Sequence, residues 1–172
     1  MVGGCDAGGA DLARWALGAW EKASGAKLHF VETKDRSKAI LRVRWADKNS
    51  GLYGEAVPIE VGGRPGAELH ILIADPTNKD RLLRDAIVYL TCLHESGHAL
   101  GLRHTSVFTD IMYNFQYGGD IDEYFGRYRR TLTTRADIGK NSALAPADRD
   151  TVLQSTPKGV PAPTGGLPCP NP

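Results

Sequence analysis

The sequence has no long apolar run and almost no net charge. No stretch approaches the roughly 20 consecutive apolar residues that a transmembrane helix needs, so nothing in it predicts a membrane span. Lys and Arg number 21 against 20 Asp and Glu, which gives a formal net charge of +1. A charge this small offers no electrostatic attraction for nucleic acid or for an anionic membrane surface. We therefore expect neither a transmembrane segment nor a nucleic-acid partner.

The length and the end of the chain predict one domain with a tail. A chain of 172 residues can bury a core without disulfide or metal staples. Past Thr156 the composition becomes rich in Pro and Gly, which favours a loose segment. We divide the chain into a domain over residues 1–156 and a tail over residues 157–172.

The most informative motif is the run from His94 to His104, which reads H-E-x-x-H-x-x-G-x-x-H. Two His four positions apart lie on one face of a helix, so His94 and His98 can bind the same ion. Gly101 tolerates the left-handed backbone that ends a helix sharply, and the chain can then return with His104 as a third ligand. Three nitrogen ligands and one open position are typical of catalytic zinc. The motif therefore predicts one catalytic Zn²⁺.

Glu95 is the candidate general base of this site. It projects from the side of the helix next to His94, where it can reach a metal-bound water without being a ligand. The plain alternative is a helix with incidental His, but the pattern arises by chance in on the order of one in a hundred thousand chains of this length. Glu123 could replace His104 as third ligand, and we discount it because His104 has the spacing of the motif.

A second motif follows, in which Met112 stands eight residues after His104 within Asp110–Tyr113. A long His motif followed by a Met-turn is the signature of the metzincins. The chain resembles these zinc metalloproteases, and the short step from His104 to Met112, with Thr105 directly after the third His, resembles the matrixin branch most. The resemblance implies that Met112 forms an apolar floor beneath the ligands. A core methionine that fills a gap is the alternative.

Some positions depart from the related families. Tyr113 stands one position after Met112, whereas astacins and serralysins have a Tyr two positions after it, so we give Tyr113 no ligand role. Matrixins usually have Pro soon after the Met, whereas Asn114 follows here, so the resemblance does not predict the shape of the specificity pocket. His70 lies near the place of one structural-zinc ligand of matrixins but lacks the companion ligands, so we take His70 and His29 as strand residues.

The three cysteines, Cys5, Cys92 and Cys169, are an odd count. An oxidising compartment would allow one pair and one remaining thiol. Cys92 lies on the zinc helix and Cys5 precedes a helix that should pack nearby, so we favour Cys5–Cys92. The resemblance adds an alternative in which Cys5 caps the zinc as a latency thiolate, although the residues around it do not match the matrixin motif.

The chain opens without the charged and then apolar leader of a secretory signal peptide. Secreted proteases of this kind normally have a leader and a latency segment. We therefore expect a secreted or cell-envelope protein in a trimmed form, with its signal peptide or pro-segment absent from this chain, and a cytoplasmic location stays open. We also expect a monomer.

Hydrophobic spacing predicts an α+β fold with four helices and four strands. The resemblance implies a metzincin-like catalytic domain, in which a twisted mixed sheet of about four to five strands and two packed helices lie above the cleft. A mainly helical subdomain would follow the Met-turn, so we place the upper subdomain at about 8–101 and the lower one at about 102–156. The predicted helices cover 8–24, 80–102, 120–132 and a last one from Ala145, and the strands cover 27–32, 38–45, 52–61 and 67–74.

Two elements have open roles. In metzincins the last strand before the zinc helix is an edge strand to which an extended peptide can add, and Ala67–Ala74 is our candidate. The alternative is an edge that bonds only to water or to its own loop. The helix over 120–132 is interpreted as a packed surface helix, with a specificity element beside the cleft as the alternative.

These features predict a zinc-dependent endopeptidase that hydrolyses peptide bonds in a peptide or protein substrate, with Glu95 as general base. The alternative is a zinc-binding protein with a metzincin fold. Such a protein would act as a binding module or on a single dedicated partner, without general proteolysis.

Overall fold

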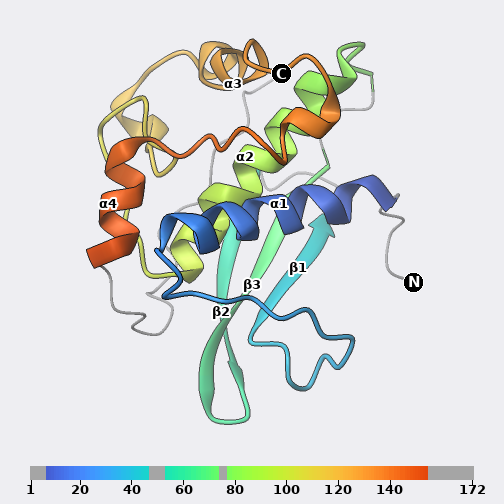
Figure 1. The fold of residues 1–172 in the computed structure, drawn as a ribbon, viewed down its shortest axis with the longest axis vertical. Coiled ribbons are helices and arrows are strands. Elements are labelled where there is room, and N and C mark those ends of the chain that lie inside the picture. The colour runs from blue at the N-terminus through green and yellow to red at the C-terminus, as the bar shows by residue number, and fades with distance from the viewer. Residues whose placement is uncertain (1–6, 47–52, 74–76, 155–172) are drawn as a thin grey trace.

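The computed structural model describes residues 7–46, 53–73 and 77–154 (Figure 1). The predicted α+β class is confirmed. The elements in chain order are helix α1 (Ala7–Ala23), strands β1 (Leu41–Ala46), β2 (Gly54–Val61) and β3 (Arg64–Leu72), helix α2 (Arg81–Ala99), the 3-10 turn η1 (Phe115–Tyr117), helix α3 (Ile121–Arg129), the 3-10 turn η2 (Arg135–Asp137) and helix α4 (Pro146–Gln154).

Within the described residues the sheet has three strands in the order β1-β3-β2, fewer than the four to five expected. β3 is parallel to β1, with Leu41 opposite Ala67, and antiparallel to β2, with Gly54 opposite Ile71. The close approach of β1 to β3 requires glycine at position 66, because a Cβ there would lie 2.2 Å from the Ile40 carbonyl oxygen.

The prediction of a strand over 27–32 is wrong. The Leu28 N–H donates to Ser24 Oγ at 3.0 Å and the Phe30 N–H donates to Glu21 Oε1 at 2.7 Å. Side chains of α1 and of the residue after it therefore accept the backbone N–H groups that would donate to a neighbouring strand in a sheet. The strand expected over 38–45 begins later, at Leu41.

The prediction that Ala67–Ala74 forms the sheet edge is also wrong. β3 bonds to a strand on each side and is central, whereas β2 has a strand partner on one side only among the residues that the structure describes. Ala67, Leu69 and Ile71 are almost fully buried and Glu68, on the opposite face, is 8% exposed. A strand covered on both faces suits the middle of a sheet.

Helices α1 and α2 pack against each other, and α2 also packs against β2 and β3 (Figure 1). The apolar side of α1 is buried, and its Trp20 is 0% exposed. The Trp20 indole N–H donates to the Leu93 carbonyl at 3.1 Å and to Ser96 Oγ at 3.0 Å. This contact fixes α1 against the half of α2 that contains the His motif.

After Gly101 the elements of the described residues are helices and 3-10 turns, as expected for this part, although the division into two subdomains stays a prediction. α3 begins at the cap Asp120 and buries Tyr124, Phe125 and Tyr128. Among the described helices, none combines the length and the hydropathy that crossing a bilayer requires. Cys92 is buried. Cys5, Cys169 and the predicted tail over 157–172 lie outside the described residues.

Candidate metal centre

Helix α2 positions three residues of the His motif deep inside the protein. Its N-terminus is capped by Asp80, whose carboxylate accepts the Leu83 N–H at 3.0 Å. His94 and Glu95, in its last turns, are 0% exposed, and His98 is 5% exposed. The helix thus delivers two imidazoles and one carboxylate to a buried location.

Gly101 follows the end of this helix with a φ of 91°, in the left-handed region that favours glycine. The Leu102 N–H donates to the Gly97 carbonyl at 3.0 Å, and the Gly101 N–H donates to the His98 carbonyl at 2.9 Å. This pair of bonds is a Schellman motif, which ends the helix and turns the chain. The turn brings His104 back towards His94 and His98.

The three imidazoles converge through their Nε2 atoms. His104 Nε2 lies 3.2 Å from His94 Nε2 and 3.1 Å from His98 Nε2. Zinc–nitrogen bonds of about 2.0–2.1 Å in a tetrahedral site put two ligand nitrogens roughly 3.3–3.4 Å apart. Among the described residues, this His group is the one cluster of three or more potential ligands whose donor atoms could hold a metal ion. The donor set and its spacing fit zinc.

Backbone carbonyl groups accept hydrogen bonds from the Nδ1 atoms of two of the imidazoles, opposite the Nε2 atoms that converge. His94 Nδ1 donates to the Ile111 carbonyl at 2.7 Å, and His98 Nδ1 donates to the Leu102 carbonyl at 3.0 Å. A proton on Nδ1 leaves the Nε2 lone pair available to a metal. His104 Nδ1 lies 3.3 Å from the side-chain amide of Asn114.

All three imidazoles are in an environment that favours their neutral form. Burial, with a smaller effect from the charge of His98, lowers the pKa of His94 well below its usual value. Burial lowers the pKa of His98 and lowers that of His104 to about 4. Neutral imidazole is the form that binds metals, so the site is ready for a cation at neutral pH.

The Met-turn lies directly against α2. Met112 is 1% exposed, and a Cβ added to Gly97 would lie 2.4 Å from its sulfur. Two backbone bonds attach the turn to the third His, because the Thr105 N–H donates to the Met112 carbonyl at 2.9 Å and the Asn114 N–H donates to the Thr105 carbonyl at 3.0 Å.

Two further residues hold the Met-turn, and the sequence analysis missed both. Asp148, 3% exposed on α4, accepts the Ile111 N–H at 3.0 Å and the Ala145 N–H at 2.8 Å. Tyr124, on α3, donates to the Ile111 carbonyl at 3.1 Å, and this same carbonyl accepts the bond from His94. Asp148 follows Pro146 in the first turn of a predicted helix, which was an available signal, but such Asp residues are usually exposed caps.

Gly54 places the start of β2 on top of Glu95. A Cβ at Gly54 would lie 2.5 Å from Thr91 Cγ2 and 2.8 Å from Glu95 Cγ. Only glycine lets the main chain approach the carboxylate side chain this closely. The edge strand of the sheet therefore passes directly beside the predicted base.

The remaining candidates lie outside the His group. His70, on β3, contacts Glu68 with 3.1 Å between Nε2 and Oε1. His29 pairs with Glu21 and lies in a loop, so its expected place on a strand is wrong. Glu123 pairs with Arg130 on the surface, and the Tyr113 hydroxyl donates to the Gly118 carbonyl at 2.6 Å.

Comparison with known proteins agrees with this geometry. A family model described as Matrixin matches residues 9–123, which is more than half of the chain. The chain belongs to the matrixin family. This matrixin is also 29% identical to a hatching enzyme of Paracentrotus lividus over 119 residues, which cover 63% of the chain and 19% of that protein. It therefore spans about a fifth of the relative's length. No solved structure gives a significant match. The predicted resemblance is confirmed at the level of the family.

Proposed function

We propose that this matrixin is a zinc endopeptidase. The observation that carries the proposal is the convergence of three imidazoles, in which His104 Nε2 lies 3.1 and 3.2 Å from the Nε2 atoms of the other two, together with a buried glutamate on the same helix. His94, His98 and His104 would hold the ion. When bound, zinc supplies Lewis acidity towards water and towards the scissile carbonyl.

Glu95 would move the protons of the reaction. Its carboxylate would accept a proton from the attacking water and then deliver it to the nitrogen of the leaving amine. Glu95 follows His94 directly on α2, and this position would keep it next to the ion without making it a ligand. Gly54 lies against its side chain, and this contact would help to hold the carboxylate in place before substrate arrives.

The substrate would be a peptide or protein in extended form, aligned along β2. Among the described residues, β2 has a strand partner on one side only. An extended peptide can pair with such an edge through main-chain hydrogen bonds. Because Gly54 begins β2 and contacts Glu95, a peptide on this edge would pass the predicted base.

One observation favours the second candidate, a zinc-binding module without general proteolysis. Glu95 has 0% exposure, so water must gain access to it before any hydrolysis. In this second candidate, the same three His would hold zinc for folding or for one dedicated partner. The expectations of a secreted protein and of a monomer stay predictions under either candidate.

A metal analysis combined with a peptide-library digest separates the two candidates. The endopeptidase should contain close to one zinc per chain and should cut library peptides in a chelator-sensitive way. Glu95→Gln should retain the zinc and lose cleavage, because the amide cannot accept the proton. Full zinc occupancy without cleavage of library or protein substrates would support the binding module, and a chain that takes up no zinc would refute both.

A further inference from the structure

His104 differs from the other two imidazoles in the group that faces its Nδ1 atom. His94 and His98 each have a backbone carbonyl oxygen in this position, and such an oxygen only accepts hydrogen bonds. His104 has the side-chain nitrogen of Asn114 at 3.3 Å, and an amide nitrogen only donates. The group behind the third predicted ligand is therefore of the opposite kind.

This contact conflicts with the form of His104 that binds an ion. An imidazole that binds a metal through Nε2 carries its proton on Nδ1 and donates it, in most cases to an oxygen. In that form the His104 Nδ1–H and the Asn114 side-chain N–H would be two donors that face each other at 3.3 Å. An acceptor is needed here, and Asn114 carries one, its Oδ1 atom, at the other end of the same amide.

The Asn114 oxygen already has a partner. It accepts the Gln116 N–H at 2.9 Å and so caps the 3-10 turn η1. The two donors lie at opposite ends of the amide, so its single oxygen reaches one of them at a time. A half-turn about the last side-chain bond, which has two nearly equivalent positions in Asn, would give the oxygen to His104 and take it from Gln116.

The backbone keeps this side chain beside His104 in either orientation. The Asn114 N–H donates to the carbonyl of Thr105 at 3.0 Å, and Thr105 follows His104 directly. The η1 turn also has a bond that does not use the Asn114 side chain, because the Tyr117 N–H donates to the Asn114 carbonyl at 3.1 Å. Loss of the side-chain cap would therefore free the Gln116 N–H without undoing the turn.

We propose that Asn114 is a positioning residue whose amide exchanges the η1 cap for His104 when His104 binds an ion. Its Oδ1 then accepts the His104 Nδ1–H, which holds the ring in the metal-binding tautomer, and the Gln116 N–H is released to solvent. Ion binding is thereby coupled to the turn that follows the Met-turn. This coupling rests on the proposed function only through the zinc site, and it does not depend on proteolysis.

Asn114→Asp is the sharpest test, because a carboxylate offers one oxygen to His104 and the other to Gln116 at the same time. The probe is zinc alone, titrated into the full chain at neutral pH in competition with a chromophoric chelator. We expect Asn114→Asp to bind zinc about tenfold more tightly than the parent, since the partners of metal-bound imidazoles change metal affinity by about 10–100-fold. A residue that served only as a cap would leave the affinity unchanged.

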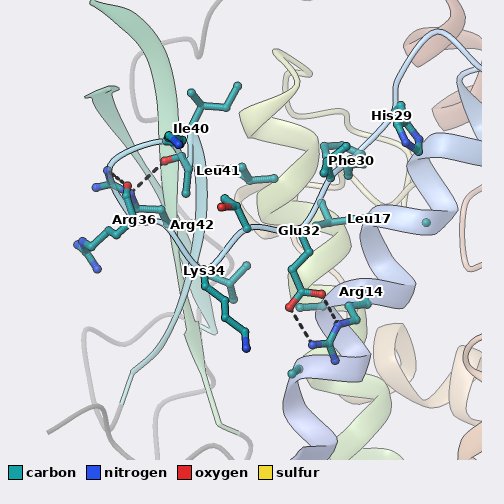
Figure 2. Close-up of a pocket in the computed structure, with 18 of the residues that line it drawn as sticks. Arg14, Leu17, His29, Phe30, Glu32, Lys34, Arg36, Ile40, Leu41 and Arg42 are labelled. Carbon is teal, nitrogen blue, oxygen red and sulfur yellow. Dashed lines mark hydrogen bonds and ion pairs between the residues drawn. The ribbon is translucent and has the colours of Figure 1, made fainter. Parts of the chain in front are cut away.

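Two variants control for the added negative charge. Gln116→Glu adds a carboxylate to a side chain that contacts Asn114 rather than His104. Lys34→Gln lowers the net charge by the same amount at a groove between α1 and β1 (Figure 2), which none of the three predicted ligands lines. Both variants should bind zinc within about threefold of the parent, because exposed charges contribute little. Circular dichroism checks that each variant is folded.

Hydrogen exchange of the Gln116 N–H, followed by NMR, reports the cap itself. In the parent, added zinc should speed this exchange by about twofold to tenfold, the range that corresponds to the loss of one hydrogen bond. In Asn114→Asp the exchange should stay slow when zinc is added, because the second oxygen retains the cap. In Asn114→Ala the exchange should be fast with or without zinc.

Two results would overturn the proposal. Unchanged exchange of the Gln116 N–H in a parent chain that binds zinc would show that the amide does not turn. Equal zinc affinities of Asn114→Asp and Gln116→Glu would reduce the effect of the new carboxylate to its charge. Both results would leave the proposed function standing, whereas a chain that takes up no zinc would refute the proposed function together with this coupling.

Discussion

Gly97→Ala tests the contact between helix α2 and the Met-turn. The added Cβ would lie 2.4 Å from the Met112 sulfur and 3.3 Å from Trp20 Cζ2. Carbon and heavier atoms pack at roughly 3.5–4.0 Å, so the sulfur must move by more than about 1 Å. Overpacking of this kind costs about 1–3 kcal/mol, and the better helix propensity of Ala returns about 1 kcal/mol. We expect the free energy of unfolding to fall by about 1 kcal/mol and zinc binding to weaken.

Gly18→Ala is the matched control, because Gly18 also lies inside a helix but a Cβ there meets nothing within 4 Å. It should stabilise the protein by about 0.5–1 kcal/mol through helix propensity alone. The difference between the two variants isolates the steric effect at Gly97.

A double-mutant cycle assigns this effect to Met112. Met112→Ala alone should cost about 2–5 kcal/mol, because the residue is 1% exposed and its removal leaves a cavity. In the double variant the methyl group added at position 97 no longer meets sulfur, so the combined loss should be smaller than the sum by at least about 1 kcal/mol.

The assay is urea unfolding of chelator-treated protein, followed by competition for zinc with a chromophoric chelator. Equal changes for Gly97→Ala and Gly18→Ala would show that Gly97 has room for a methyl group. A cycle that is additive within about 0.5 kcal/mol would show that Met112 is not the residue displaced.

Other perturbations test the supports of the site. Asp148→Asn should lower the free energy of urea unfolding by about 1–3 kcal/mol, because an amide nitrogen would replace one of the two carboxylate oxygens, both of which accept the Ile111 N–H, and full stability would refute its anchoring role. Tyr124→Phe should cost about 0.5–1.5 kcal/mol and weaken zinc binding, since the Ile111 carbonyl loses a donor; zinc affinity equal to that of the parent would contradict this. The Leu83 N–H holds the pKa of the Asp80 carboxyl below its usual value, with burial opposing and Arg129 adding to the effect. A carboxyl whose pKa is lowered in the folded state stabilises the protein above about pH 4, and this stabilisation is lost as the pH falls through the folded-state pKa. The difference in unfolding free energy between the parent and Asp80→Asn should therefore be constant from about pH 8 to 5 and should shrink below about pH 4. Zinc removal should lower the thermal midpoint, because a bound ligand stabilises only the folded state; an unchanged midpoint would argue against a zinc site.

The convergence of the three His was predictable because the residues that produce it are close together in the sequence. His94 and His98 share a helix face through their spacing of four, and Gly101 lies at the turn that returns His104. The supports were not predictable in the same way. Asp148 reaches Ile111 across 37 positions of sequence, and no periodic pattern encodes a contact at that distance.

The segment over 27–32 shows what a period-two pattern does and does not determine. Leu28 and Phe30 pack against the core while His29 and Val31 are exposed, so the burial of this segment alternates as it would in a strand. The pattern could not predict the hydrogen-bond partner. Glu21 supplies one by accepting the Phe30 N–H, and the segment lies beside α1 without joining the sheet.

One residue, Pro58, favours a position for β2 at the edge of the sheet. Pro58 lies within β2 and has no N–H to donate, so a strand that contains it belongs at the edge of a sheet. The central strand β3 also contains a proline, but Pro65 precedes Ala67, where the pairing with β1 begins, so it removes no hydrogen bond from that pairing. Pro58 also limits where an added peptide can form hydrogen bonds with β2. Ladder bonds cannot use Pro58 as a donor, and Gly54 is the end of the strand that contacts Glu95. We therefore expect a substrate to pair mainly with the Gly54 end, so Gly54→Val should impair peptide cleavage far more than Ile59→Thr, and equal activity of these two variants would refute that alignment.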